Sequence, residues 1–161
     1  MICGVDEAGR GPWAGPVCAG AVILDPGIPI AGLADSKTLA SARRAALSLE
    51  IEDKALAFAL GWASASEIDQ LNIRRATHLA MTRAIDGLGV VPELALIDGN
   101  AAPSELRCPA RSIVKGDKSE PCISAASIIA KTARDKVMAD SDALYPGYGF
   151  AQHKGYGTRA H

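Results

Sequence analysis

Residues 1–24, MICGVDEAGRGPWAGPVCAGAVIL, decide the fold, because two apolar runs flank a turn built from glycine and proline. The first run, Met1–Glu7, stays apolar until it meets two acids, and this pattern predicts a strand. Gly9–Gly15 predicts a tight turn, and Val17–Leu24 predicts a second strand that Asp25-Pro26-Gly27 ends. So short a connection favours antiparallel pairing of the two strands.

The rest of the chain alternates between strand and helix patterns. Ala55–Ala63 has the apolar density of a third strand, which would complete an antiparallel meander. Between the second and third strands, Ser41 could cap a short helix that reaches Leu49. Later segments predict, in order, an amphipathic helix over Asn72–Leu88, strands over Leu94–Asp98 and Ser112–Asp117, a helix over Ile123–Met138 and an ordered loop over Tyr145–Thr158. This order predicts an α/β fold in which a mixed five-stranded sheet, part meander and part parallel, is flanked by helices.

Length and composition are those of one globular domain, residues 1–161. The chain is 48% hydrophobic and 22% charged, which excludes disordered, collagen-like and coiled-coil classes. Its longest charge-free apolar stretch, Gly11–Leu24, has 14 residues broken by prolines, too short for a membrane span. Asp6 and Glu7 stand where a signal peptide would be apolar. The four cysteines lack metal-site spacing, so we expect reduced thiols and a cytoplasmic protein.

Charge is unevenly distributed, although the net charge is only −1. Residues 107–161 carry nine basic and five acidic side chains, whereas residues 1–106 carry eight and thirteen. Such halves can form a cleft with acids at its floor and bases at its rim, as a metal-dependent phosphodiester enzyme needs. The alternative is that these charges are ordinary solvated surface.

Carboxylates follow three predicted strands, at Asp6-Glu7, Asp98 and Asp117, and Asp135 lies on the helix after the last of them. Ligand sites in open α/β sheets lie beyond strand ends, so these acids could converge. Clustered carboxylates need cations to neutralise them, and hard oxygen ligands select Mg²⁺ or Mn²⁺. Each acid alone could equally be a turn residue. Neighbours on a regular strand face opposite ways, so Asp6 and Glu7 can act together only where the strand gives way to the turn.

Seven segments in this order resemble the type 2 ribonucleases H, and among them bacterial ribonuclease HII. The matching segments cover most of the chain: GVDEAGRGPWAGP (4–16), DSKTL (35–39), ASEIDQLNI (65–73), LIDGN (96–100), VKGD (114–117), ISAASIIAKTARD (123–135) and YPGYGFAQHKGYGT (145–158). The resemblance implies a ribonuclease H-like fold. It also implies an endoribonuclease that hydrolyses the RNA strand of RNA–DNA hybrids and cuts 5′ to single ribonucleotides in duplex DNA, leaving 3′-hydroxyl and 5′-phosphate ends.

The same resemblance assigns residues to roles. Asp6, Glu7, Asp98 and Asp117 match the acids that bind two Mg²⁺ or Mn²⁺ ions in a two-metal-ion mechanism, and Asp135 matches a supporting catalytic acid near the second ion. The substrate-binding residues implied are Gly9, Arg10 and Gly11, which contact the 2′-hydroxyl that distinguishes RNA from DNA, and Tyr156, which packs on the next deoxyribose. Lys37 and Arg134 are expected phosphate contacts or surface cations.

The expected partners are RNA–DNA hybrids and ribonucleotide-containing duplex DNA, bound by a monomer that has no membrane association. Relatives continue past the GYGT segment, whereas this chain ends at His161, so a missing helical segment and weaker substrate binding are expected. One alternative is therefore a junction-binding form with weak or no cleavage. Another is an unrelated Mg²⁺-dependent phosphohydrolase that shares only the carboxylates.

Overall fold

The two apolar runs at the N-terminus form the antiparallel pair that their pattern predicts, in a computed structural model that describes residues 1–9, 15–33 and 38–144. Strand β1 (Ile2–Ala8) pairs with β2 (Val17–Ile23) from Gly4–Val22 to Ala8–Cys18. Every residue of β2 is buried, which explains why its sequence is a continuous apolar run without alternation.

Three further strands complete one mixed sheet in the order β3-β2-β1-β4-β5. Strand β3 (Ala57–Ala63) pairs antiparallel with β2 and completes the predicted meander. Strand β4 (Leu94–Asp98) runs parallel to β1 on its other side, and β5 (Ala110–Ile113) runs parallel to β4. The predicted α/β fold with a mixed five-stranded sheet is therefore confirmed.

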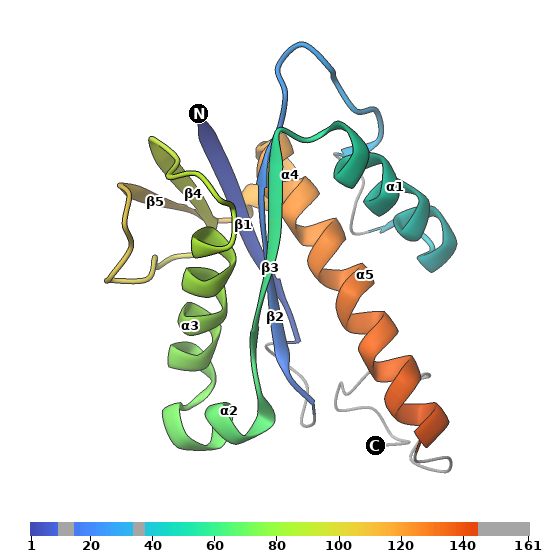
Figure 1. Ribbon diagram of the computed structural model, residues 1–161, viewed down its shortest axis with the longest axis vertical. Coiled ribbons are helices and arrows are strands. Elements are labelled where there is room, and N and C mark those ends of the chain that lie inside the picture. The colour runs from blue at the N-terminus through green and yellow to red at the C-terminus, as the bar shows by residue number, and fades with distance from the viewer. Residues whose placement is uncertain (10–14, 34–37, 145–161) are drawn as a thin grey trace.

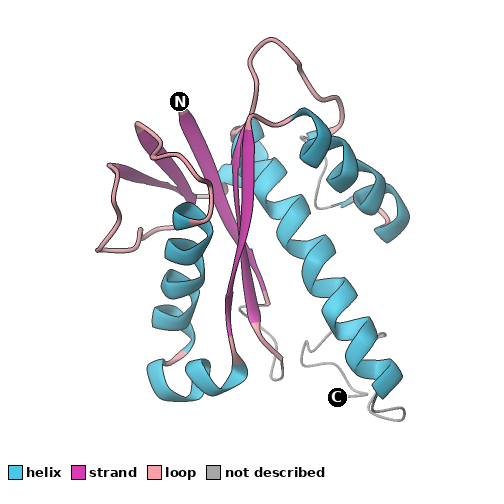
Figure 2. Cartoon of the chain, in the orientation of Figure 1, coloured by secondary structure: helices cyan, strands magenta, loops and turns pink. Residues whose placement is uncertain are grey.

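Helices cover both faces of the sheet. Helix α3 (Ile73–Asp86) packs on one face, and the long helix α5 (Pro121–Leu144) packs on the other, with α1 (Ser41–Lys54) lying against α5 (Figure 1). Figure 2 shows the same three layers, with the magenta strands between cyan helices. Each layer boundary has its own apolar core, one around Val5, Ala80 and Ile97, the other around Val22, Ile51 and Ile128.

Glycines in the sheet allow the helices to approach closely. A Cβ at Gly4 would collide with the backbone at Cys122 and Ile123, where α5 begins. A Cβ at Gly61 would collide with the backbone of α3 at Ala80 and Ala84. These contacts fix α5 against β1 and α3 against β3.

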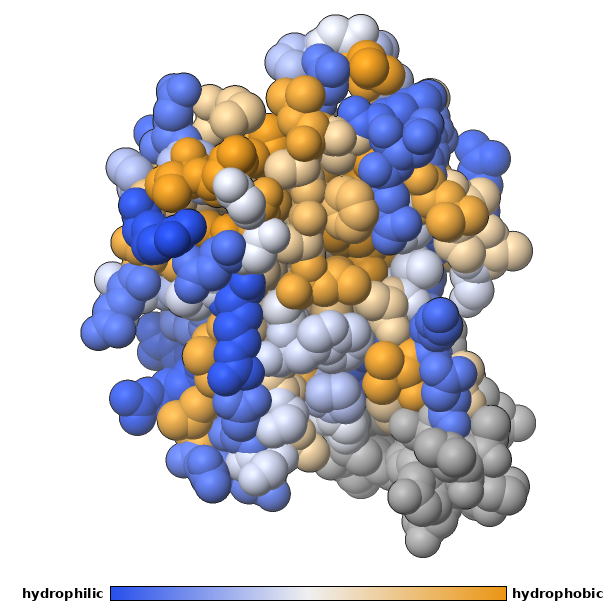
Figure 3. Space-filling view, viewed as in Figure 1, coloured by the Kyte–Doolittle hydropathy of each residue, from blue (hydrophilic) through white to orange (hydrophobic). Residues whose placement is uncertain are grey.

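Strand β3 is an edge of the sheet, and two of its large side chains remain partly exposed. Phe58 is 40% and Leu60 is 37% exposed. Figure 3 shows apolar side chains gathered over the part of the surface where β3 faces the viewer. The edge carbonyl of Trp62 accepts a hydrogen bond from Arg83, so part of this edge is bonded to α3.

Several predicted boundaries are wrong. Helix α1 continues to Lys54 because Ile51 still packs in the core. Ser41, the predicted cap, is instead its first helical residue, and the N-cap Ala40 makes no side-chain capping bond. A separate helix α2 (Ala65–Leu71) precedes α3 and was not predicted. Helix α5 is longer than predicted, and the loop predicted over Tyr145–Thr158 lies outside the described residues.

The last predicted strand is also wrong at its end. The extended strand stops at Ile113, because Lys115 adopts a left-handed conformation with φ of 55° and the chain enters the one-turn helix α4 (Gly116–Ser119).

Among the helices that the structure describes, none is long and apolar enough to cross a membrane.

Candidate active site

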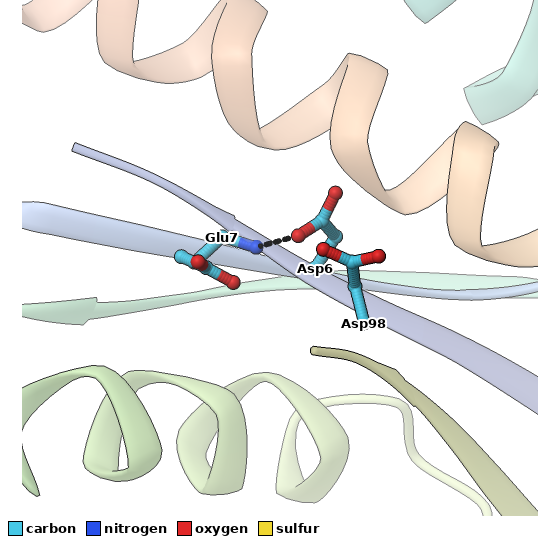
Figure 4. A group of neighbouring side chains, drawn as sticks. All are labelled: Asp6, Glu7 and Asp98. Atoms are coloured by element: carbon cyan, nitrogen blue, oxygen red, sulfur yellow. Dashed lines mark hydrogen bonds between the residues drawn. The ribbon is translucent and has the colours of Figure 1, made fainter. Parts of the chain in front are cut away.

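The parallel pairing of β1 with β4 brings the first acids together. The last paired residues are Val5 and Ile97, so the next residue on each strand, Asp6 and Asp98, lies at the same edge of the sheet. Figure 4 shows the side chains of Asp6 and Asp98 beside each other, with Glu7 next along β1. Oxygen atoms of Asp6, Glu7 and Asp98 all lie within 4.8 Å of one another. The predicted convergence of these three acids is thus confirmed.

Two neighbours on one strand share this site because the strand is close to its end. Strand β1 stops at Ala8, and Gly9 follows with a φ of 96°. The backbone N–H of Glu7 donates to Oδ1 of Asp6 at 2.8 Å, which fixes the Asp6 carboxylate relative to the backbone. Asp6 and Glu7 thus lie near the end of β1, as expected if both acids act where the strand gives way to the turn.

Electrostatics at this site favour a bound cation. Asp6 is 5% exposed, and burial, reinforced by the charges of Glu7 and Asp98, raises the pKa of its carboxyl well above the usual range. A cation among the three carboxylates would reverse that shift, because it stabilises their charged forms. The donors are all hard oxygens, which suits Mg²⁺ or Mn²⁺ and does not suit a structural zinc ion. The residues present therefore fit a divalent metal.

Asp117 reaches the site from a helix and not from a strand end, which corrects the prediction. The left-handed turn at Lys115 directs the chain into α4, and Gly116 packs against Ile123 where a larger residue would not fit. The backbone N–H of Asp117 donates to Oδ1 of Asp98 at 3.2 Å, and the Asp117 residue is 2% exposed. Asp117 thus lies directly beside Asp98, while the group within 4.8 Å comprises the other three acids.

Asp135 is held by α1 and is not among the three clustered carboxylates. Its Oδ2 accepts a hydrogen bond from Nη1 of Arg44 at 2.8 Å, in an ion pair that is mostly shielded from solvent. Nothing in the sequence pointed to Arg44, because 91 residues separate the two partners and no local spacing relates them.

Arg134 is not a solvated surface cation, which was one of the two roles expected for it. The residue is 1% exposed on α5, and its Nε donates to the backbone carbonyl of Pro16 at 2.9 Å. Its position in the sequence gave no sign of this burial, because Lys131 and Lys136 flank it in a polar stretch. Gly9 is buried at the end of β1, whereas the predicted substrate contacts Arg10, Gly11, Lys37 and Tyr156 lie outside the described residues.

Comparisons with known proteins point to one family. The family model for ribonuclease HII matches residues 3–161. A ribonuclease HII of Laribacter hongkongensis is 61% identical over 161 residues, which cover 99% of this chain and 81% of that protein. A ribonuclease HII of Caulobacter vibrioides is 59% identical over 160 residues, which cover 99% of this chain and 75% of that protein.

Solved structures with the same fold include a ribonuclease H2 and a ribonuclease HIII. The ribonuclease H2 of Pyrococcus horikoshii has a TM-score of 0.83 and 26% identity, and the match covers 98% of this chain and 81% of that one. A ribonuclease HIII described in complex with Mn²⁺ has a TM-score of 0.77 and 20% identity, covering 89% of this chain and 54% of that one, and it supports the fold alone. The chain therefore belongs to the ribonuclease HII family and is a metal-dependent endoribonuclease with ribonuclease H activity on RNA–DNA hybrids.

Proposed function

We propose that this chain, besides degrading the RNA strand of hybrids, cuts duplex DNA on the 5′ side of a single embedded ribonucleotide. The products are a 3′-hydroxyl and a 5′-phosphate, and the reaction uses two Mg²⁺ or Mn²⁺ ions. The observation that carries this proposal is the group of three carboxylates, Asp6, Glu7 and Asp98, at adjoining ends of two parallel strands. Oxygen-rich sites of this kind suit the metal-assisted transfer of a phosphoryl group.

In this proposal Asp6, Glu7, Asp98 and Asp117 hold the ions. When bound, the ions supply an activated water and charge stabilisation for the departing 3′-oxygen. The chain's contribution is to fix the ligands: Asp6 is oriented by the N–H of Glu7, and Asp98 by the N–H of Asp117. Asp135 has a supporting role, with Arg44 fixing the direction of its carboxylate. These backbone hydrogen bonds and the Arg44–Asp135 ion pair orient the carboxylates in advance, so less free energy is needed to order the site when the substrate binds.

Recognition of the ribonucleotide is assigned to the turn that follows β1. In this proposal Gly9, Arg10 and Gly11 contact the 2′-hydroxyl, Tyr156 packs on the neighbouring deoxyribose, and Lys37 contacts a phosphate. Support comes from Gly9, whose φ of 96° directly after β1 allows backbone to approach a ligand closely. Since Asp6, Glu7 and Asp98 come from one chain, the proposed enzyme works as a monomer.

The test is strand cleavage of a labelled DNA duplex that holds one ribonucleotide, with an all-DNA duplex beside it. We expect cutting only 5′ to the ribonucleotide and only with Mg²⁺ or Mn²⁺. Asp98→Asn is expected to lower the rate by at least about 100-fold, because it removes a metal ligand. Asp140→Asn, which changes an exposed carboxylate on α5, serves as the matched control and should leave the rate unchanged.

Three results are decisive here. Cleavage of the all-DNA duplex at a similar rate would count against recognition of the 2′-hydroxyl. Full activity of Asp98→Asn would count against the carboxylate site. Binding of the ribonucleotide duplex without cleavage, by a folded protein in the presence of Mn²⁺, would favour a junction-binding function instead.

A further inference from the structure

Arg134 lies against Gly9, Gly15 and Pro16, the described ends of the segment that connects β1 to β2. The last ladder pair between these strands joins Ala8 to Cys18, so beyond it the segment depends on other contacts. One of these is the hydrogen bond from Nε of Arg134 to the carbonyl oxygen of Pro16, at 2.9 Å. This bond ties the return end of the segment, next to β2, to helix α5.

The same guanidinium also touches the outgoing end of the segment. A Cβ at Gly9 would collide with Nε of Arg134 and lie 2.7 Å from its Cδ. A Cβ at Gly15 would lie 3.4 Å from Nη2 of Arg134 and 2.8 Å from the sulfur of Met138. Gly9 and Gly15 have φ of 96° and 88°, a conformation that side chains with a Cβ rarely adopt. Gly9 is therefore fitted to the shape of Arg134, and Gly15 to the shapes of Met138 and Arg134.

A buried arginine needs a reason, because removing its charge from water is costly. Arg134 is 1% exposed, more deeply buried than Lys131 or Asp135 on the same helix. The planar guanidinium carries several donors in fixed directions, so one side chain can meet two backbone segments at once. A lysine has a single flexible ammonium group and a methionine has no donor, so neither can replace both contacts.

We infer that Arg134 is a positioning residue for substrate recognition: it clamps Gly9 against Gly15 and Pro16, and so holds the backbone of Gly9 in place at the end of β1. This inference rests on the proposed function, in which Gly9 is one of the residues that contact the 2′-hydroxyl. The carboxylates that would hold the ions lie on β1, β4 and α4 and make their own hydrogen bonds. Loss of the clamp is therefore expected to weaken recognition of the substrate while metal binding persists.

The experiment compares Arg134→Met, Arg134→Lys and Gly15→Ala with the unmodified chain. For each, KM and kcat are measured on the duplex with one ribonucleotide, and the affinity for Mg²⁺ is measured by calorimetry. We expect KM to rise about tenfold in all three variants, while kcat and the Mg²⁺ affinity stay within about twofold. Gly15→Ala combined with Arg134→Met is expected to be no worse than either change alone, because both act on the same contact.

Two control variants separate this role from general destabilisation. Met138→Leu keeps a side chain of similar size beneath Gly15, and Ile51→Val removes one methyl group from the core between α1 and α5. Both should keep the KM of the unmodified chain even where they lower its melting temperature.

The outcomes separate this inference from the proposed function. A folded Arg134 variant with unchanged KM overturns the inference, and so does a loss of kcat and Mg²⁺ affinity at constant KM. If Arg134→Met fails to fold, Arg134→Lys and Gly15→Ala carry the test by the same criteria. An unmodified chain that does not cut at the ribonucleotide overturns the proposed function, and this inference with it.

Discussion

Asp6 shows how a metal site and a stable fold make opposite demands on one residue. Burial and the neighbouring charges of Glu7 and Asp98 raise the pKa of its carboxyl, so without a metal its charged form destabilises the fold. The unfolded chain has no such penalty, and there the Asp6 carboxyl titrates near 3.9. Between these two pKa values the folded protein binds more protons than the unfolded chain. The stability that depends on this proton is present below about pH 3.9 and is lost as pH rises through the folded pKa.

Replacement of Asp6 by asparagine should therefore stabilise the metal-free protein at neutral pH. We expect Asp6→Asn to raise the free energy of unfolding at pH 7 by on the order of 1–3 kcal/mol, and this gain should shrink as pH falls toward 4. Urea denaturation in EDTA across this pH range measures both effects. The exposed Asp69 on α2 offers a control, because a substitution on the surface such as Asp69→Asn should change the free energy of unfolding by less than about 0.5 kcal/mol. A gain that is constant between pH 4 and pH 7 would contradict the assignment.

The connection between α2 and α3 depends on a second charged group, with the opposite pH dependence. Two hydrogen bonds of 2.8 Å join Arg83 to Glu67, and Glu67 also forms a capping box with Ser64 at the start of α2. The Arg83 guanidinium, with a smaller contribution from the Ser64 backbone N–H, lowers the pKa of Glu67 to about 2. The stabilisation is thus present above the unfolded pKa, near 4.3, and is lost as pH falls toward 2.

Loss of this link should have a small effect that depends on pH. Because the pair is exposed to solvent, Glu67→Gln is expected to lower the melting temperature at pH 6 by at most about 2–3 °C. The difference from the unmodified chain should disappear near pH 2. Thermal melts followed by circular dichroism test this, with Glu50→Gln in the partly buried pair with Lys54 as a comparison in another helix. A difference that persists at pH 2 would mean that Glu67 acts through packing and not through its charge.

Close packing of α3 on β3 makes Gly61 a more sensitive position. A Cβ there would collide with the backbone of α3 at Ala80 and Ala84, so the helix would have to move away from the sheet. We expect Gly61→Ala to lower the free energy of unfolding by about 1–3 kcal/mol. Gly27→Ala, where the added Cβ would meet only Asp25 Oδ1 at 3.4 Å, should change it by less than about 0.5 kcal/mol. Equal effects in denaturant titrations would contradict this account of the interface.

The elements that the sequence predicted best are those whose apolar pattern is long. The meander and the stripe of α3 followed from runs of buried residues, and these runs match the observed cores. Helix α2 was missed because none of its seven residues is buried, although the Ser64–Glu67 capping box marks its start. Strand β5 was extended too far because Val114 continues its apolar run, whereas the left-handed conformation of Lys115 leaves no trace in periodicity.

Within the site, the sequence predicted best those residues that lie at the ends of strands. Asp6, Glu7 and Asp98 could be grouped from the sequence because parallel strands place their ends at one edge of a sheet. The pairing of Asp135 with Arg44 and the burial of Arg134 could not be, since each depends on contacts between segments far apart in the chain. Local patterns carry information on periodicity and turns, but not on which remote groups meet.

For the whole molecule, the carboxylates couple metal binding to folding. Asp6 lies on β1, which pairs with both halves of the sheet and packs against α5, and Asp98 lies on the parallel neighbour of β1. A cation that joins them stabilises the folded state over the unfolded chain, in which the acids are far apart. At a free concentration 100 times the dissociation constant, the gain is about 2.7 kcal/mol. This corresponds to a rise of roughly 5–10 °C in melting temperature for a domain of this size.

Titration of Mg²⁺ or Mn²⁺ against the melting temperature tests this coupling. We expect the melting temperature of the unmodified chain to rise with the logarithm of cation concentration above the dissociation constant, because each tenfold increase adds about 1.4 kcal/mol. Asp98→Asn should respond much less, since a ligand has been removed, whereas Asp140→Asn should follow the unmodified chain. A general ionic effect would instead raise all three melting temperatures together. In that case NaCl at the same ionic strength would raise them as well. Since the same substitution lowers cleavage in the proposed function, a single variant relates the stability of the fold to the metal site that the reaction requires.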